Sequence, residues 1–149
     1  MAIRSIRKIG DPVLRMKAKK VKKITDNTLK LIADMFETLH DAPGVGLAAP
    51  QVGISQRIIV VHVKDDQFAL INPKILEASG SQIGDEGCLS VPGEQDLVDR
   101  FEYVKVRGLD PNGEEVLISA EGLLARCLQH EIDHLDGILF VDKIYRGES

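Results

Sequence analysis

The sequence has no tryptophan, only two cysteines, and few aromatic residues of any kind (4%) among its 149 residues. Two cysteines do not make the disulfide framework of a small secreted protein, so we interpret Cys88 and Cys127 as metal ligands or small buried residues. No apolar stretch approaches the ~20 residues of a membrane span. Residues 1–8 lack the apolar stretch of a secretory signal. We therefore expect a cytoplasmic protein with no membrane partner.

The composition is that of an ordinary globular protein, with 44% hydrophobic and 28% charged residues. These fractions argue against a disordered or fibrous chain. No internal repeat, low-complexity segment or linker is visible in the sequence. The length suits one domain with a hydrophobic core, so we predict a single domain over residues 1–149.

Charge is unevenly distributed along the chain. Residues 1–30 hold ten Lys and Arg against two Asp and Glu, a net charge of +8, and the remainder therefore carries −12 to reach the total of −4. Most of the lysines lie in residues 15–23, which we interpret as a solvated surface strand or loop; a docking patch for RNA or another acidic partner is the alternative. No aromatic residue is interleaved with them, so single-strand stacking is not indicated, and we expect no DNA partner.

The most informative stretch is residues 129–134, which read Gln-His-Glu-Ile-Asp-His. Residues four apart lie on one face of a helix, so His130 and His134 can point their imidazoles at one metal ion. Glu131 is then well placed to act as general base on a water at that metal. The pattern also arises by chance on solvated helices. The flanking residues favour a buried helix instead, on which two histidines and a carboxylate would be costly without a shared ligand.

Two helices are predicted from apolar residues that recur every three or four positions. The first follows Thr25-Asp26 and ends before residues 41–44. Its apolar stripe consists of Leu29, Ile32, Ala33, Phe36 and Leu39. The second runs from about Gly122 to Asp136 and carries the histidines, with Gly137 as its C-terminal stop.

Strands are predicted where β-branched or alternating apolar residues occur. The expected strands are residues 58–63 and 68–71 as one hairpin, residues 75–83, and residues 101–107 and 115–118 as a second hairpin. His62 lies in the first of these strands without ligand spacing to another residue, and we interpret it as a packed or surface histidine.

Two further segments contain candidate functional residues. Residues 44–53 include three glycines, which permit close backbone approach by another chain or a ligand, and Gln51 is the only polar side chain there. A tightly packed loop with an exposed glutamine explains this segment equally well. Residues 85–93 place Cys88 beside a glycine in a mostly polar, turn-rich stretch, an unusual place for a core thiol. Cys88 is therefore a candidate third metal ligand.

Three segments together resemble the three motifs of the peptide deformylases in sequence, order and separation. They are residues 44–51 (GVGLAAPQ), residues 86–90 (EGCLS) and residues 129–134 (QHEIDH). The resemblance extends from near the N-terminus to about Phe140. It implies an α+β fold in which antiparallel sheets pack around a central helix carrying the His-Glu-x-x-His motif, with one further helix in the N-terminal part.

The same resemblance implies a hydrolase that removes the formyl group from the N-terminal formylmethionine of newly synthesised polypeptides and releases formate. By the resemblance, the metal ligands are Cys88, His130 and His134, and the catalytic residues are Glu131 as acid and base, with Gln51 and the Leu89 amide facing the formyl oxygen. Gly46 would pair with the substrate backbone. The methionine side chain would lie near Val45, Leu124, Cys127 and the His130 ring.

The cofactor implied is one divalent metal ion, with Fe(II) favoured by the resemblance. A Cys-His-His set also suits Zn(II), and Ni(II) or Co(II) are further alternatives. The expected partners are N-formylmethionyl nascent polypeptides, with transient association with the ribosome. Some family members have a long C-terminal helix that reaches the ribosome, which this sequence lacks, so we expect any such contact to use another surface. Some also have a substrate-binding arginine where this chain has Gly93-Glu94-Gln95-Asp96.

Two rival functions share the histidine motif. A zinc endopeptidase is disfavoured because the third ligand proposed here is a cysteine upstream of the helix, and Glu148 is the only glutamate after Glu131. A structural metal module would instead close a four-ligand site with both Cys88 and Cys127. Helix geometry argues against it, because Cys127 and His134 lie ~10.5 Å apart along the axis at ~1.5 Å rise per residue.

Overall fold

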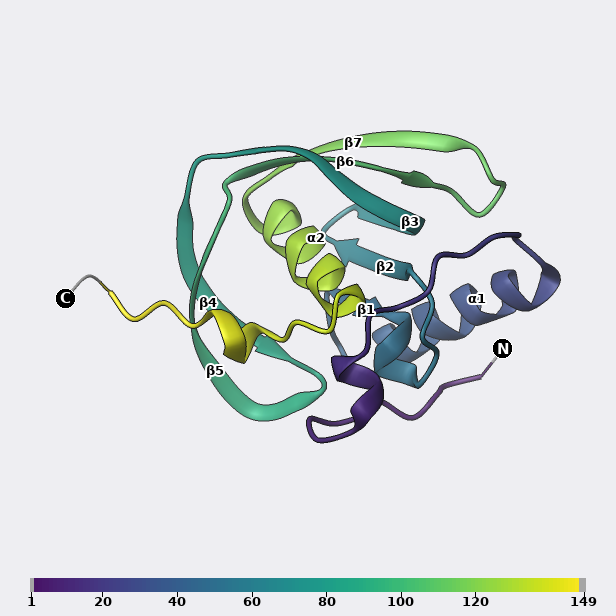
Figure 1. Cartoon of the computed structure of the whole chain (residues 1–149), viewed down its shortest axis with the longest axis horizontal. Helices are drawn as coiled ribbons and strands as arrows, with labels where there is room; N and C mark the ends of the chain where they lie inside the picture. Colours follow the sequence, from purple (N-terminus) through teal and green to yellow (C-terminus); the bar gives the residue numbers. More distant parts are fainter. Residues whose placement is uncertain (1, 148–149) are drawn as a thin grey trace.

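A computed structural model describes residues 2–147 of the chain (Figure 1). Two α-helices, seven strands and three short 3₁₀ helices lie within these residues. In chain order they are η1 (Pro12–Arg15), α1 (Asp26–Asp41), β1 (Gly46–Ala48), η2 (Ala49–Val52), β2 (Ile58–Val63), β3 (Asp66–Ser79), β4 (Gln82–Cys88), β5 (Val91–Arg100), β6 (Tyr103–Leu109), β7 (Glu115–Glu121), α2 (Gly122–Leu135) and η3 (Phe140–Lys143).

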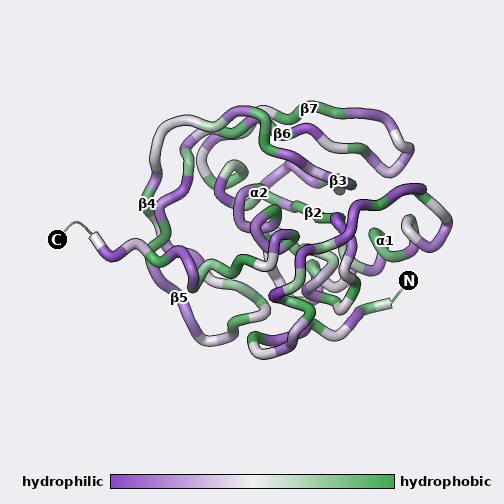
Figure 2. The backbone as a smooth tube through the Cα atoms, viewed as in Figure 1, coloured by the Kyte–Doolittle hydropathy of each residue, from purple (hydrophilic) through white to green (hydrophobic). Residues whose placement is uncertain are grey.

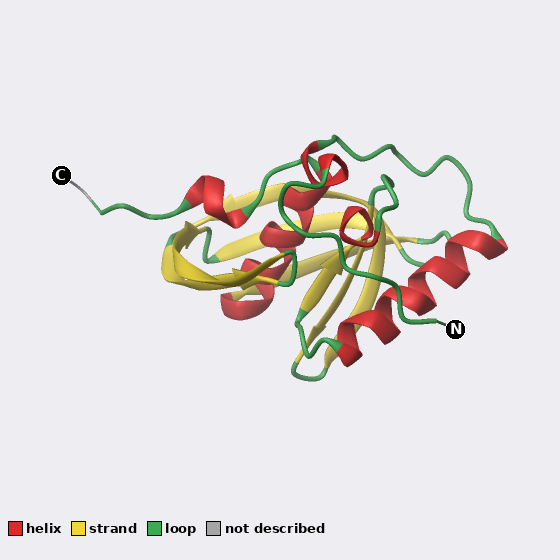
Figure 3. Ribbon diagram, turned by 90° about the horizontal axis from the view of Figure 1, so that it is seen from below, coloured by secondary structure: helices red, strands yellow, loops and turns green. Residues whose placement is uncertain are grey.

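All strand pairs in the two sheets are antiparallel. Five strands form one sheet in the order β1-β2-β3-β6-β7, and β4 pairs with β5 in a second sheet. Helix α2 packs against β1, β2, β6 and β7, whereas α1 packs against β1 and β2 (Figures 1 and 3). The predicted α+β class, with antiparallel sheets and two helices, is confirmed. Within residues 2–147 there is no helix whose length and apolar character would let it cross a membrane.

Helix α1 begins at Asp26, as the sequence predicts, and ends at Asp41, one residue beyond the predicted end. Thr25 caps it, because its side chain accepts a hydrogen bond from the Thr28 amide and the Thr28 side chain accepts one from the Thr25 amide. The buried face contains Leu31, Ile32, Met35 and Leu39. Leu29 is 42% exposed, so the prediction that it belongs to the buried stripe was wrong. The choice of face depends on the sheet that the helix meets, which spacing alone does not specify.

Strand β3 differs from the prediction of two separate strands, at residues 68–71 and 75–83. It runs from Asp66 to Ser79 through Asn72-Pro73, with an irregularity in its pairing to β6 between Ile71 and Lys74. Proline lacks an amide donor and is accommodated at such irregularities. Asn72 adopts a positive φ of 53°, and its side chain bonds both backbone groups of Val21 (2.8 and 2.9 Å).

The β4–β5 hairpin is the element that sequence patterns missed most completely. The sequence predicts a polar, turn-rich segment over residues 85–93, but the turn is confined to residues 89–90 and the rest belongs to two paired strands. Figure 2 shows the mixed hydropathy of these strands. Two of the side chains that the hairpin buries are charged, Glu86 and Arg100, so an apolar alternation is weak here.

Helix α2 ends at Leu135, and Gly137 follows with a left-handed φ of 75°. A Cβ at this glycine would lie 2.6 Å from the Arg15 carbonyl oxygen. The Gly137 amide donates to the His134 carbonyl (3.1 Å), which satisfies one of the last carbonyls of the helix.

We predict that Gly137→Ala lowers the free energy of unfolding by more than ~2 kcal/mol. An L-residue in the left-handed region costs ~1–2 kcal/mol, and the methyl group would also press on the Arg15 backbone. Gly113→Ala is the matched control, because Gly113 has a φ of 83° but its Cβ would meet only Ile24 at 3.7 Å. Urea unfolding of both variants measures the difference. Equal losses would contradict a role for the Arg15 contact.

Candidate metal centre

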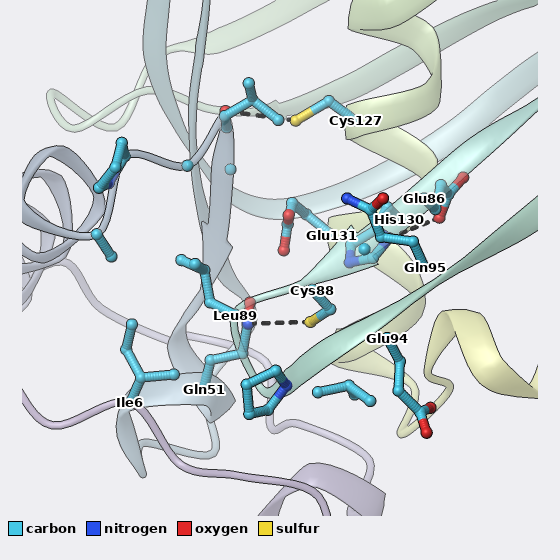
Figure 4. A pocket seen from close by; sticks show the side chains of 18 of the residues that line it. Ile6, Gln51, Glu86, Cys88, Leu89, Glu94, Gln95, Cys127, His130 and Glu131 are labelled. Atoms are coloured by element: carbon cyan, nitrogen blue, oxygen red, sulfur yellow. Dashed lines mark hydrogen bonds and ion pairs between the residues drawn. The ribbon is translucent and has the colours of Figure 1, made fainter.

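Three potential ligand side chains converge beside the pocket, which Cys88 and His130 line directly and His134 adjoins through Cys88. Cys88 lies at the end of β4, and His130 and His134 lie one turn apart on α2. One ligand atom from each of these residues lies within 4.8 Å of the other two, and the Cys88 Sγ to His134 Nε2 distance is 3.3 Å. Figure 4 shows Cys88, His130 and Glu131 around this point. The backbone therefore brings together the thiol and two imidazoles that the sequence singled out.

The chemistry of this group fits a divalent transition metal. One thiolate and two imidazoles are ligands that such ions accept, and three protein ligands leave a coordination position open. His134 Nδ1 and Glu131 Oε1 are buried and have no hydrogen-bond partner among the described residues. Buried polar atoms are normally paired. The free Glu131 oxygen agrees with a site that also holds water, whereas His134 Nδ1 lies on the far side of a ring whose Nε2 faces Cys88.

Cys127 and His62 lie outside this group. The Cys127 Sγ faces the Val45 carbonyl at 3.5 Å, and burial, with the negative charges of Glu131 and Glu86, raises the pKa of its thiol well above the usual value. His62 Nδ1 lies 2.9 Å from His40 Nε2 on the neighbouring helix. The geometry thus separates the two cysteines, with Cys88 beside the histidines and Cys127 against β1.

Glu86 connects the candidate ligands to the hairpin. Its Oε1 lies 2.7 Å from His130 Nδ1, and both of its oxygens accept hydrogen bonds from the Arg100 guanidinium at 2.7 and 2.9 Å. Arg126, on α2, also donates to Glu86 (2.6 Å). Burial would raise the pKa of Glu86, but the hydrogen bonds from Arg100 and His130 outweigh it and hold this pKa far below the usual range.

The Glu86 network was not found by sequence reasoning. Glu86 stands in the EGCLS motif without a predicted partner, and Arg100 and Arg126 lie outside the three motifs. A signal was present in the spacing, because Arg126 lies four residues before His130 and therefore on the same face of α2. Carboxylates that orient a metal-ligating histidine through its second ring nitrogen are a common arrangement.

The pKa values of the two histidines are shifted in opposite directions. Burial alone lowers the pKa of His130, but hydrogen bonds to Cys88 and Glu86 raise it to about 10. For His134, burial and the positive charge of His130 lower the pKa well below its usual value. The Cys88–Glu86 side of the cluster therefore attracts positive charge.

Glu131 is directed toward β1. Its side chain is almost completely buried, and burial raises its pKa to about 7. A Cβ on Gly46 would lie only 2.7 Å from Glu131 Oε2 and 2.7 Å from Cys127 Sγ. Only a glycine at position 46 allows β1 to approach α2 this closely, which explains one of the three glycines in residues 44–53.

Gln51 is held in one orientation beside Cys88. Its Oε1 accepts a hydrogen bond from the Ala48 amide (2.9 Å), and its Nε2 donates to Ser90 Oγ (3.2 Å) and lies 3.5 Å from Cys88 Sγ. Gln51 is 1% exposed, so the alternative of an exposed glutamine on a packed loop was wrong. Leu89, in the turn directly after Cys88, lines the same pocket.

The pocket has a volume of about 950 Å³ and opens beside the candidate ligands. Predicted site residues that line it are Val45, Gly46, Gln51, Cys88, Leu89, Cys127, His130 and Glu131. Leu124 is a correction, because it packs against the core cluster formed by the sheet and α2 and is not part of the lining. Its neighbour Leu123, 48% exposed, lines the pocket instead. Successive helix residues point ~100° apart, so a shift of one residue changes the face.

Comparisons with known proteins agree with this geometry. The sequence profile of the family described as polypeptide deformylase matches residues 3–149. The chain is 56% identical to peptide deformylase 1 of Clostridium acetobutylicum over 149 residues (100% of this chain, 99% of that protein) and 60% identical to peptide deformylase of Halothermothrix orenii over 152 residues (100% and 99%).

Solved structures show the same fold. The crystal structure of peptide deformylase from Thermotoga maritima superposes with a TM-score of 0.94 at 46% identity and covers 96% of this chain and 98% of that one. The peptide deformylase from Synechococcus elongatus in complex with actinonin gives a TM-score of 0.91 at 46% identity, covering 95% and 78%. Sequence identity over the full length and fold similarity lead to the same conclusion: the chain belongs to the polypeptide deformylase family of hydrolases.

Proposed function

We propose that this chain removes the formyl group from the N-terminal formylmethionine of newly synthesised polypeptides and releases formate. The observation that carries the proposal is the convergence of Cys88, His130 and His134 near Glu131 beside the pocket. We propose that residues 1–149 act as one catalytic domain in the cytoplasm. Its partners are N-formylmethionyl nascent chains, met in transient association with the ribosome.

Cys88, His130 and His134 would hold one divalent metal ion. When bound, such an ion supplies Lewis acidity, which lowers the pKa of water and polarises a carbonyl oxygen. We propose Fe(II) as the physiological ion, with Zn(II), Ni(II) and Co(II) as alternatives that the same donors accept.

Proton transfer is assigned to Glu131. Its carboxylate lies in the same pocket as the ligands, with Oε1 free of protein partners among residues 2–147. This oxygen would take a proton from the attacking water and hold it until the amine of the substrate departs, which then receives it. Burial keeps competing water away from the carboxylate during the transfer.

Gln51 and Leu89 are assigned to the formyl oxygen, where negative charge develops. The contacts to Ala48 and Ser90 fix the Gln51 amide before substrate arrives, so its Nε2 donor requires little reorganisation. The Leu89 backbone N–H would be the second donor. Removing one donor from such an arrangement typically costs ~2.7–4 kcal/mol of transition-state stabilisation.

The remaining pocket residues are assigned to substrate binding. The methionine side chain would pack against Val45, Leu123, Cys127 and the His130 ring. Strand β1 lies at the edge of the five-stranded sheet, with Gly46 paired to Val61 on one side. Its other side is available to pair with the backbone of an extended peptide through Gly46.

Formate release from a formyl-Met peptide is the experiment that tests this function. The same peptide with a free amino terminus is the control for peptide-bond cleavage, because an endopeptidase would cut both. A structural metal module would act on neither. Loss of the formyl group without internal cleavage is the expected result, and cleavage of both peptides would instead support the protease.

We predict that Glu131→Gln retains the metal and loses nearly all turnover. The amide preserves the shape of the side chain but cannot accept the proton. Metal content and formate release are measured on the same preparation. A variant with full metal content and activity within a few fold of wild type would exclude the proton-transfer role.

We predict that Cys88→Ser loses most of the metal and the activity, whereas Cys127→Ala keeps the metal and mainly weakens discrimination for methionine. The reason is position, since the Cys88 Sγ lies 3.3 Å from His134 Nε2 and the Cys127 Sγ faces the Val45 carbonyl. Metal analysis of the two variants, with kcat/KM for formyl-Met and formyl-norleucine peptides, measures both effects. The reverse pattern would move the ligand assignment to Cys127.

For the metal itself, we expect anaerobically purified protein to contain iron. The iron form should lose activity in air faster than forms reconstituted with Ni(II) or Co(II), because iron and the neighbouring thiolate are both open to oxidation. Elemental analysis and activity half-lives in air measure this. Equal half-lives of the iron and nickel forms would argue against damage centred on iron.

A further inference from the structure

The N-terminal segment before η1 bridges the two segments that carry the proposed oxyanion donors. The Arg7 amide donates to the Gln51 carbonyl (2.7 Å), and the Ile9 amide donates to the Ser90 carbonyl (2.8 Å). Side chains alternate along an extended segment. In agreement with this, the pocket is lined by Ile6, which precedes Arg7, and by Lys8, which lies between Arg7 and Ile9. This segment therefore forms one wall of the pocket mouth.

Lys8 places an uncompensated positive charge on this wall. Its Nζ donates to the Leu89 carbonyl at 3.2 Å, and no carboxylate oxygen of residues 2–147 lies within 4.0 Å of it. An ammonium group has three donors, so this one contact leaves donors that can reach a peptide in the pocket. The other permanent cation of the lining, Arg126, is bound to Glu86 and cannot serve this purpose.

The wall opposite this segment carries negative charge. Glu94 of β5 lines the pocket, is exposed, and forms no ion pair with another described residue. Figure 4 shows Ile6 on one side of the pocket and Glu94 with Gln95 on the other. The residues that follow a bound formylmethionine would leave the pocket between these walls.

We propose that Lys8 is a specificity-determining residue that favours an acidic side chain in one of the two residues after the formylmethionine. The inference rests on the proposed function, because it assumes that the formylated end lies at Cys88 and Gln51. An extended peptide directs alternate side chains to the two walls, so only one of the two positions faces Lys8. The neighbouring position faces Glu94, where an acidic side chain is disfavoured.

The test measures kcat/KM for formate release from formyl-Met tripeptide amides. Glu, Gln or Lys is placed at the second or the third position, and the C-terminal amide removes the only other carboxylate. At low ionic strength we expect kcat/KM of the Glu peptide to exceed that of the Gln peptide about fivefold at one of the two positions. This is the factor that the attraction of two opposite unit charges about 4 Å apart in water gives. High salt should remove the difference, because charges at a pocket mouth are screened.

Substitutions at position 8 then assign the effect to one side chain. Lys8→Met should bring the Glu-to-Gln ratio close to 1, Lys8→Glu should invert it, and Lys8→Arg should preserve it. Lys30→Met, which removes an exposed lysine of α1 outside the pocket, makes the same charge change and should leave the ratio as in wild type.

Other outcomes overturn the inference in distinguishable ways. If wild type releases formate from all peptides at similar rates, Lys8 does not select substrates. If Lys8→Met lowers kcat equally for every peptide, Lys8 only supports the Leu89 segment. If no peptide releases formate, the proposed function itself has failed, and the selectivity proposed for Lys8 fails with it.

Discussion

The site depends on the hydrogen bonds and ion pairs that the buried Glu86 carboxylate makes. It receives hydrogen bonds from Arg100 on β5 and Arg126 on α2, and it also bonds the ring of His130. One carboxylate thus joins the hairpin to the helix and fixes an imidazole. Buried ion pairs contribute little net stability, but removing one partner leaves an uncompensated charge and costs ~3–5 kcal/mol. The network therefore favours the one arrangement of α2 and the β4–β5 hairpin in which all of these charged groups are paired.

A second constraint is the close approach of β1 to α2. With no side chain, Gly46 brings the edge of the five-stranded sheet against Glu131 and Cys127, where a Cβ would lie 2.7 Å from both side chains. The same approach leaves the backbone of β1 open toward the pocket. Sheet edge, hairpin and helix come from distant parts of the sequence: β1 supplies open backbone, β4 supplies Cys88, and α2 supplies both histidines and Glu131.

The parts of the structure that depend on local signals could be predicted from the sequence. The cap at Thr25, the helical period of α1 and the left-handed Gly137 are examples. The predictions that were wrong concern features that depend on tertiary contacts between elements. Leu29 and Leu124 were each assigned to a face that only tertiary contacts decide. The β4–β5 hairpin was missed because charged groups paired with one another, Glu86 and Arg100, occupy buried positions in it, and an apolar pattern cannot reveal such pairs.

The charges around His130 explain how one histidine can be both buried and available as a ligand. Arg100 and Arg126 together offset the negative charges of Glu86 and Asp133, with which they form ion pairs. His130 therefore need not carry a positive charge to balance Glu86, and a neutral ring can donate its Nδ1 proton to that carboxylate. Its other nitrogen then presents a lone pair beside Cys88. The hydrogen bonds that raise the pKa of His130 to about 10 mean that a proton competes for this lone pair. Occupation of the site by a cation should therefore release a proton and be weakened by acid, as for other ligand sets that must lose protons.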